Sequence, residues 1–248
     1  MRAPAVAAYL ARADAAILPL GPTEAHGLHL PLGCDHLIAT ATAVLAAEAA
    51  DALVLPPFAF SWPGATARLP GTLRLGPDLV QSALAAVLEG ALAAGFRRLA
   101  LVCAHGPDEH LGTLVGRAFF ERSGRPVAVH HAVPGRGTTA RERELAALDQ
   151  AAERADPGQG ETSRLLAALE ILGLPADLVD RAASPAQGPP QPPALREPLR
   201  RGGAGFYYTD LPQHIPTPSR ADQAAGRAYL EAAAAAIVDS LAAMRELG

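Results

Sequence analysis

Residues 21–35 carry several side chains that could bind a metal ion. This stretch, which contains glycines and prolines, holds Glu24, His26, His29 and Asp35. Imidazole and carboxylate groups together suit zinc, manganese or iron better than metals that prefer thiolate ligands. The alternative interpretation is a polar loop in which Asp35 only caps the following helix. The spacing of these residues leaves both interpretations open.

Two later segments carry side chains of the same kinds. Residues 103–110 place His105 after an apolar run, and residues 158–163 place Glu161 in a glycine-containing turn before a predicted helix. A single histidine there is commonly structural, and Glu161 could serve only to complement a helix dipole. In open α/β sheets, however, sites form beyond the carboxyl ends of strands. Residues 21–35 and 103–110 both follow predicted strands, which favours one shared cavity.

The elements that would position these residues alternate along the chain. Short apolar runs, several rich in β-branched residues, predict buried strands at 15–20, 52–57, 98–104 and 126–133. Helical periodicity and boundary residues predict helices at 35–50, 77–95, 141–155, 161–172 and 221–246. Strands that alternate with helices in this way predict an α/β fold with a mostly parallel central sheet, arranged as a three-layer α/β/α sandwich.

The chain is expected to form a single domain over residues 1–248. This length is sufficient for one large α/β domain with a substantial core. Residues 184–205 are rich in proline and glycine, which predicts an irregular surface segment. We do not interpret this segment as a linker between domains, because the final helix still needs a core on which to pack.

The composition narrows the classes of function. A formal net charge of -4 gives no electrostatic reason to expect binding to nucleic acid or to an acidic membrane surface. Two cysteines, Cys34 and Cys103, do not make a disulfide framework in a chain of this size, which fits a reducing compartment. No apolar run reaches the length of a membrane span, and the N-terminal residues lack the apolar core of a signal peptide. We therefore expect a soluble cytoplasmic protein.

The first segment also resembles a known family. Glu24-Ala-His26-Gly-Leu-His29-Leu-Pro31, followed by Asp35, resembles the signature of the creatininase (creatinine amidohydrolase) family. Further matches occur in the order of the family's motifs, and they are Pro70-Gly71-Thr72, Gly95-Phe-Arg-Arg, His105-Gly106 and Gly158-x-x-Glu161-Thr162-Ser163. The first match is specific, whereas the others are individually weak and gain force from their order.

The resemblance implies a centre with two divalent metal ions, which would be zinc, manganese or iron. Glu24, Asp35 and His105 would hold one ion, and His26, Asp35 and Glu161 would hold the other, so that Asp35 bridges the pair. In such a centre, a water between the ions becomes a hydroxide near neutral pH and attacks a carbonyl group.

The resemblance bears on the roles of Glu161, Asp156 and His29, but not on that of His214. In creatininase itself, a glutamate two residues after the histidine that corresponds to His105 is a metal ligand. That position is Pro107 here, which leaves Glu161 for the role. The family histidine that would protonate the leaving nitrogen is replaced by Asp156, which could act as a catalytic acid if burial raised its pKa. His29 is expected to support the ligands or to face the substrate. His214, near two prolines, is expected at the surface or in a subunit contact.

The implied function is that of a metal-dependent amidohydrolase. It would cleave the C–N bond of a small-molecule, non-peptide amide, such as a cyclic or formyl amide, by means of a metal-bridged hydroxide. One alternative is a peptide-processing member of the same family. Another is a degenerate, non-catalytic member that binds metal or serves in assembly. This alternative stays open because Asp156 replaces the family's catalytic histidine. The family resemblance also implies a homo-oligomer, commonly a hexamer.

Overall fold

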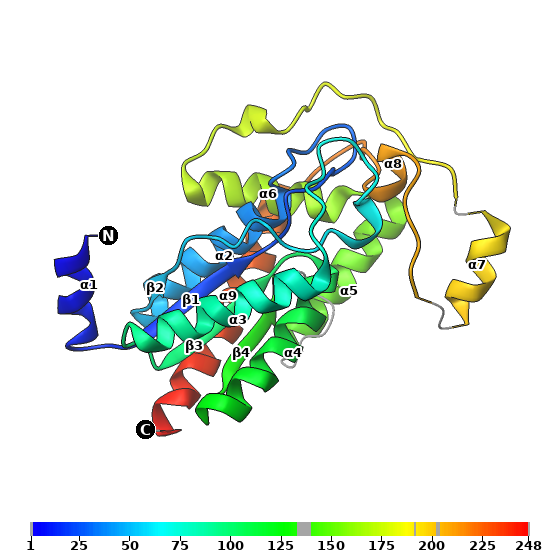
Figure 1. The fold of residues 1–248 in the computed structure, drawn as a ribbon. Coiled ribbons are helices and arrows are strands. Elements are labelled where there is room, and N and C mark those ends of the chain that lie inside the picture. The colour runs from blue at the N-terminus through cyan, green and yellow to red at the C-terminus, as the bar shows by residue number, and fades with distance from the viewer. Residues whose placement is uncertain (1, 133–139, 191, 202–203, 248) are drawn as a thin grey trace.

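A four-stranded parallel sheet lies at the centre of the computed structural model, which describes residues 2–132, 140–190, 192–201 and 204–247 (Figure 1). The strands run in the order β2-β1-β3-β4 and every pair of neighbours is parallel. Their bounds are Ala15–Leu20 for β1, Leu53–Val54 for β2, Arg98–Cys103 for β3 and Val127–His131 for β4. The predicted strand at 52–57 is much shorter than expected, because Pro56 and Pro57 have no amide hydrogen to donate to a neighbouring strand.

Helices cover both faces of this sheet, which confirms the predicted three-layer arrangement. Helices α2, α6 and α9 pack on one face, and their bounds are Cys34–Ala50, Gln159–Leu172 and Gln223–Ala243. Helices α3 and α4 cover the other face, with bounds Pro77–Ala93 and Gly106–Ser123 (Figure 1). Alternate residues of each central strand enter the two layers. Ile17 faces the first layer, for example, and Leu18 faces the second.

Helix α4 was not predicted, although it covers much of one face. Its sequence contains Gly112 and Gly116, which suggest a loop when taken alone. In the structure a Cβ atom at Gly112 would lie 3.2 Å from Cγ1 of Val129 and 3.4 Å from Cδ1 of Leu101. These glycines therefore let the helix axis approach strands β3 and β4 closely.

The remaining elements are short or peripheral. The helices are α1 at Ala3–Leu10, α5 at Ala140–Ala155, α7 at Pro193–Arg200 and α8 at Leu211–His214, and the 3-10 turns are η1 at Gly64–Thr66, η2 at Ala176–Leu178 and η3 at Met244–Leu247. Helix α7 lies within the segment 184–205 that was predicted to be irregular. Pro193 is tolerated in its first turn, and Glu197 forms ion pairs with Arg200 and Arg201 one turn later.

Two expectations concern the chain as a whole. The single domain over residues 1–248 remains a prediction. Among the described residues, no helix combines the length and the apolar character that crossing a bilayer requires.

Candidate metal centre

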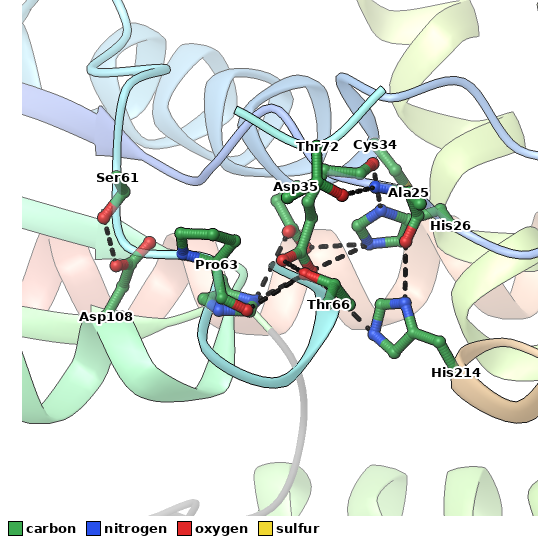
Figure 2. Close-up of polar contacts among 12 residues, drawn as sticks. Ala25, His26, Cys34, Asp35, Ser61, Pro63, Thr66, Thr72, Asp108 and His214 are labelled. Carbon is green, nitrogen blue, oxygen red and sulfur yellow. Dashed lines mark hydrogen bonds and ion pairs between the residues drawn. The ribbon is translucent and has the colours of Figure 1, made fainter. Parts of the chain in front are cut away.

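The loops after β1 and β3 open at the same edge of the sheet. Leu20 and Cys103, the last residues of these strands, are partners in the parallel register. Residues 21–33 follow β1 and lead into α2, whereas His105 follows β3 and precedes α4. The side chains that meet at this edge are drawn in Figure 2. The expected sharing of one site by these two loops is therefore seen in the structure.

Glu24 lies at the centre of this group and is completely buried. Its carboxylate Oε2 accepts a hydrogen bond from the hydroxyl of Thr66, which belongs to the turn η1. The other oxygen, Oε1, has no hydrogen-bond partner and lies 3.3 Å from Nδ1 of His105. A buried carboxylate oxygen without a donor is costly, so this atom fits a position that faces a cation.

Asp35 lies between two histidines rather than at a helix cap. Gly33 is the N-cap residue of α2, so the interpretation of Asp35 as the cap is wrong. The carboxylate of Asp35 is 2% exposed. Its Oδ1 lies 3.4 Å from Nε2 of His26, and its Oδ2, which has no hydrogen-bond partner, lies 3.5 Å from Nδ1 of His105. One carboxylate thus presents one oxygen to each histidine.

Glu161 approaches His26 from the first turn of helix α6. Its Oε1 lies 3.3 Å from Nε2 of His26, and the thiol of Cys34 lies 4.0 Å from the same oxygen. Gly158, the N-cap of this helix, has φ +87°, and a Cβ atom there would lie 2.0 Å from the carbonyl oxygen of Pro216. Only glycine fits this close approach, which fixes the start of the helix that carries Glu161.

The ligand atoms form three compact groups among the described residues. The atoms of each group lie within 4.8 Å of one another, and the groups are Glu24, Asp35 and His105; His26, Cys34 and Glu161; and Glu24, His26 and His214. All five predicted metal ligands belong to at least one group. The first group contains the three residues that were expected to share one ion. In the second group Cys34 stands beside His26 and Glu161, where Asp35 was expected.

His214 was not predicted to lie in this site. Its side chain is only 12% exposed, which contradicts the expected surface position. Nδ1 of His214 lies 2.8 Å from the carbonyl oxygen of Ala25, and its ring packs edge-on against His26 with centroids 5.0 Å apart (Figure 2). No local pattern indicates this position, because the contacting residues are 189 positions apart in the chain.

The charges of the cluster depend on one another. Burial lowers the pKa of His105, but Glu24 and Asp35 outweigh it and raise this pKa to about 9. Burial raises the pKa of Asp35, but His26 and His105 lower it to about 2. In the same way, Asp35 raises the pKa of His26 despite its burial. Protons on the histidines thus supply the positive charge that the carboxylates require, and a bound divalent cation would supply the same charge.

The composition of the cluster fits a metal centre of the expected kind. Carboxylate oxygens and imidazole nitrogens are typical ligands of zinc, manganese and iron. Burial keeps the thiol of Cys34 protonated by raising its pKa well above the usual value, which fits a packing residue better than a nucleophile. The unpartnered oxygens of Glu24 and Asp35 are the observation that a cation explains best.

The two predicted catalytic residues lie outside these groups. Asp156 accepts hydrogen bonds from the amide and hydroxyl of Ser219 and from the amide of Arg220. Burial raises the pKa of Asp156, but these hydrogen bonds outweigh it and leave the pKa below its usual value. The condition for a catalytic acid, a pKa raised by burial, is therefore not met. His29 is buried, and its Nε2 lies 2.8 Å from the hydroxyl of Thr162, next to Glu161.

Residues 103–110 contain three further acidic or histidine side chains, namely Asp108, Glu109 and His110. Asp108 is buried, accepts a hydrogen bond from Ser61, and has a pKa that burial raises to about 7. His110 is exposed on α4. Neither Glu109 nor His110 belongs to the compact ligand groups in the described part of the chain.

Solved structures share the fold over nearly the whole chain. A structure titled "Creatininase Mn" superposes with a TM-score of 0.70 at 25% identity, covering 100% of this chain and 96% of that one. A crystal structure of creatinine amidohydrolase (creatininase) gives a TM-score of 0.72 at 23% identity, covering 98% of this chain and 95% of that one.

Curated relatives match parts of the chain, whereas a family match covers nearly all of it. Curated proteins named mycofactocin precursor peptide peptidase match parts of the chain. The protein of Mycobacterium tuberculosis (strain CDC 1551 / Oshkosh) is 38% identical over 100 residues, which are 36% of this chain and 39% of that protein. That of Mycolicibacterium smegmatis is 41% identical over 66 residues, which are 24% and 27% of the two chains. Residues 1–241 match the family described as creatininase, creatinine amidohydrolase, and the chain therefore belongs to the creatininase family.

Proposed function

We propose that this protein is a dinuclear metal-dependent amidohydrolase that cleaves the C–N bond of a small-molecule, non-peptide amide, such as a cyclic or formyl amide. The main support for this proposal is the state of two buried carboxylates. The carboxylates of Glu24 and Asp35 are buried, each has an oxygen without a hydrogen-bond partner, and both oxygens face His105. Such an arrangement is stabilised by a cation and is costly without one.

The proposed ligand sets are those implied by the family. Glu24, Asp35 and His105 bind one ion, and His26, Asp35 and Glu161 bind the other. The distances of 3.3–3.5 Å between His105 Nδ1 and the two facing carboxylate oxygens support the first set. Those of 3.4 and 3.3 Å from His26 Nε2 to Asp35 and Glu161 support the second. When bound, zinc, manganese or iron would supply Lewis acidity and an activated water for attack on an amide carbonyl.

The protein's own residues hold the ligands in place. Thr66 fixes the carboxylate of Glu24 through its hydroxyl. The carbonyl oxygen of Glu24 lies 3.1 Å from Nδ1 of His26, which leaves Nε2 of that ring to face the cluster. His29, paired with Thr162, joins the first loop to the start of α6 and so positions Glu161. We assign Asp156 to holding the turn at Ser219 and Arg220.

A peptide-processing function is the second candidate, and one feature of the structure favours it. A cavity of about 340 Å³ is lined by aromatic and proline side chains that include Phe206, Tyr208 and Pro216. The ring of Tyr208 lies 4.9 Å from that of His214, so the cavity adjoins the proposed metal centre. A cavity of this kind suits an apolar or aromatic side chain of a peptide. The names of the two curated relatives are consistent with this candidate.

Metal analysis combined with hydrolysis assays tests these proposals. The purified protein is analysed for bound metal and then assayed, with zinc, manganese or iron(II) added, against cyclic amides, formyl amides and peptides with aromatic residues. Two bound ions with hydrolysis of a small amide support the leading proposal, whereas cleavage of peptides alone supports the second. Two bound ions without turnover on any substrate would support the non-catalytic alternative. A protein that binds no metal contradicts all three.

A homo-oligomer in the cytoplasm completes the proposal. Three apolar side chains at the carboxyl edge of the sheet are exposed, namely Leu32, Phe60 and Leu73, at 39%, 58% and 43%. Hydrogen bonds of Thr23 with Ala59 and Leu73 hold the loops that carry them together. Contact with a second copy would bury this surface. Light scattering of the purified protein measures the number of subunits, for which the family suggests a hexamer.

A further inference from the structure

His214 is the residue of the cluster that no predicted ligand set contains. It is the last residue of the short helix α8, which lies far along the chain from the other candidate ligands but close to them in space (Figures 1 and 2). The backbone holds this position firmly. Gly27 has φ +64°, and a Cβ atom there would lie 2.2 Å from the carbonyl oxygen of Ile215. The loop after β1 and the loop at 214–216 therefore pack directly on each other.

The hydrogen bond to Ala25 determines which nitrogen of His214 is available. A carbonyl oxygen can only accept a hydrogen bond, so Nδ1 carries the proton of the 2.8 Å contact with Ala25. Nε2 of the neutral ring is then an acceptor. This is the arrangement of a typical metal-binding histidine, whose second nitrogen donates to a carbonyl or carboxylate. His26 has the same arrangement, because its Nδ1 lies 3.1 Å from the carbonyl oxygen of Glu24.

Three histidine nitrogens surround one unpartnered oxygen. Oε1 of Glu24 lies 3.3 Å from His105 Nδ1, 3.8 Å from His214 Nε2 and 4.0 Å from His26 Nε2. The separation from His214 is too long for a hydrogen bond. Two groups that both carry lone pairs face each other across it, which is unfavourable unless a cation lies between them.

We propose that His214 is an additional metal ligand, which donates Nε2 to a divalent cation held by Glu24. The inference rests on the proposed metal centre and adds to it a ligand from the C-terminal third of the chain. It gives the centre a third imidazole and makes the loop at 206–216 depend on the metal. The same loop carries Tyr208, which packs against His214 and lines the neighbouring cavity.

Metal titration of the full-length protein tests this proposal. The wild-type protein and the variants His214→Ala, His214→Gln and His110→Ala are stripped with a chelator and titrated with zinc against a chromogenic competitor. His110 is an exposed histidine on α4, so its variant is the matched control. We expect one of two zinc sites to lose affinity by at least about 10-fold in both His214 variants, because even partners of ligands contribute 10–100-fold. The control should bind like the wild type.

A spectroscopic measurement makes the result independent of affinity. Cobalt(II) replaces zinc in the same four proteins, and its visible absorption reports the ligands of the ion. Loss of an imidazole should change the spectrum of both His214 variants and leave that of His110→Ala unchanged. Two zinc sites of wild-type affinity and an unchanged cobalt spectrum in folded His214→Gln would overturn the assignment of His214 as a ligand, but not the proposed metal centre. Failure of the wild-type protein to bind any metal would instead overturn the proposed centre.

Discussion

The two ends of the sheet differ in how their charged side chains are paired. At the amino end, before β1 and at the start of β3, Arg98 donates a hydrogen bond of 2.6 Å to Asp14, and Arg12 pairs with Asp51. At the carboxyl end one oxygen each of Glu24 and Asp35 has a histidine as its neighbour and lacks a hydrogen-bond donor. The chain itself pairs the charges at the amino end, whereas the proposed metal ions would pair those at the carboxyl end.

This difference separates charges that serve the fold from charges that serve the site. A carboxylate beside an arginine needs no further partner, so its contribution is present as soon as the chain folds. A buried cluster of carboxylates without such a partner reduces stability, and proteins keep such clusters where they bind a ligand or catalyse a reaction. Substitutions at the two ends should therefore affect metal binding and stability differently.

Asp35→Asn should cause the largest loss, because this carboxylate presents an oxygen to both His26 and His105. We expect the affinity for metal to fall by more than about 100-fold, since even residues that only orient ligands contribute 10–100-fold. The metal content of the dialysed protein measures the effect. Asp14→Asn, which removes a carboxylate from the amino end, is the control and should keep both ions. Retention of two ions by Asp35→Asn would contradict the bridging assignment.

Removal of the metal should lower thermal stability. At a hundredfold excess over the dissociation constant, each bound ion stabilises the folded state by about 2.7 kcal/mol. For a chain of this size we expect the melting temperature to fall by at least about 5 °C after chelation. Melting curves with and without the chelator measure this change. Asp35→Asn should show little response to the chelator, and an equal response in both proteins would place the ions elsewhere.

Arg98→Ala should weaken the fold and leave the metal in place. The guanidinium of Arg98 is buried, donates to Asp14 and also donates to the carbonyl oxygen of Leu241 at the end of α9. We expect the free energy of unfolding to fall by about 2 kcal/mol. The loss is not larger because Asp14 is partly exposed, so water can replace part of its pairing with Arg98. Urea denaturation measures the loss. Arg12→Ala, at an exposed pair, should have no measurable effect, and loss of metal from Arg98→Ala would contradict the separation of the two ends.

Asp156→Asn should have the smallest effect. Hydrogen bonds from Ser219 and Arg220 hold the pKa of Asp156 below its usual value, despite the opposite effect of burial. Its stabilisation, about 1 kcal/mol, is therefore present at neutral pH and is lost as the pH falls below about 4. The stability difference between variant and wild type should disappear in acid. If the metal-loaded variant lost more than about 100-fold in turnover, Asp156 would instead act in proton transfer.

Most of the fold and most members of the candidate ligand groups were predictable, because both depend on local patterns. Apolar runs such as 15–20 and 98–104 identified the strands, and parallel strands bring the residues after them to one edge. Helix α4 was missed because its glycines are required by packing against Val129, which no local pattern reports. His214 was missed for a similar reason, since its place depends on the distant Ala25.

The hydrogen bond between His29 and Thr162 joins residues that are 133 positions apart. During translation the first strand and the loop after it leave the ribosome long before Glu161 and His214 are made. Early in synthesis the nascent chain therefore exposes Glu24, His26 and Asp35 without their later partners. The candidate ligand groups that contain Glu161 and His214 therefore form only after these residues have been synthesised.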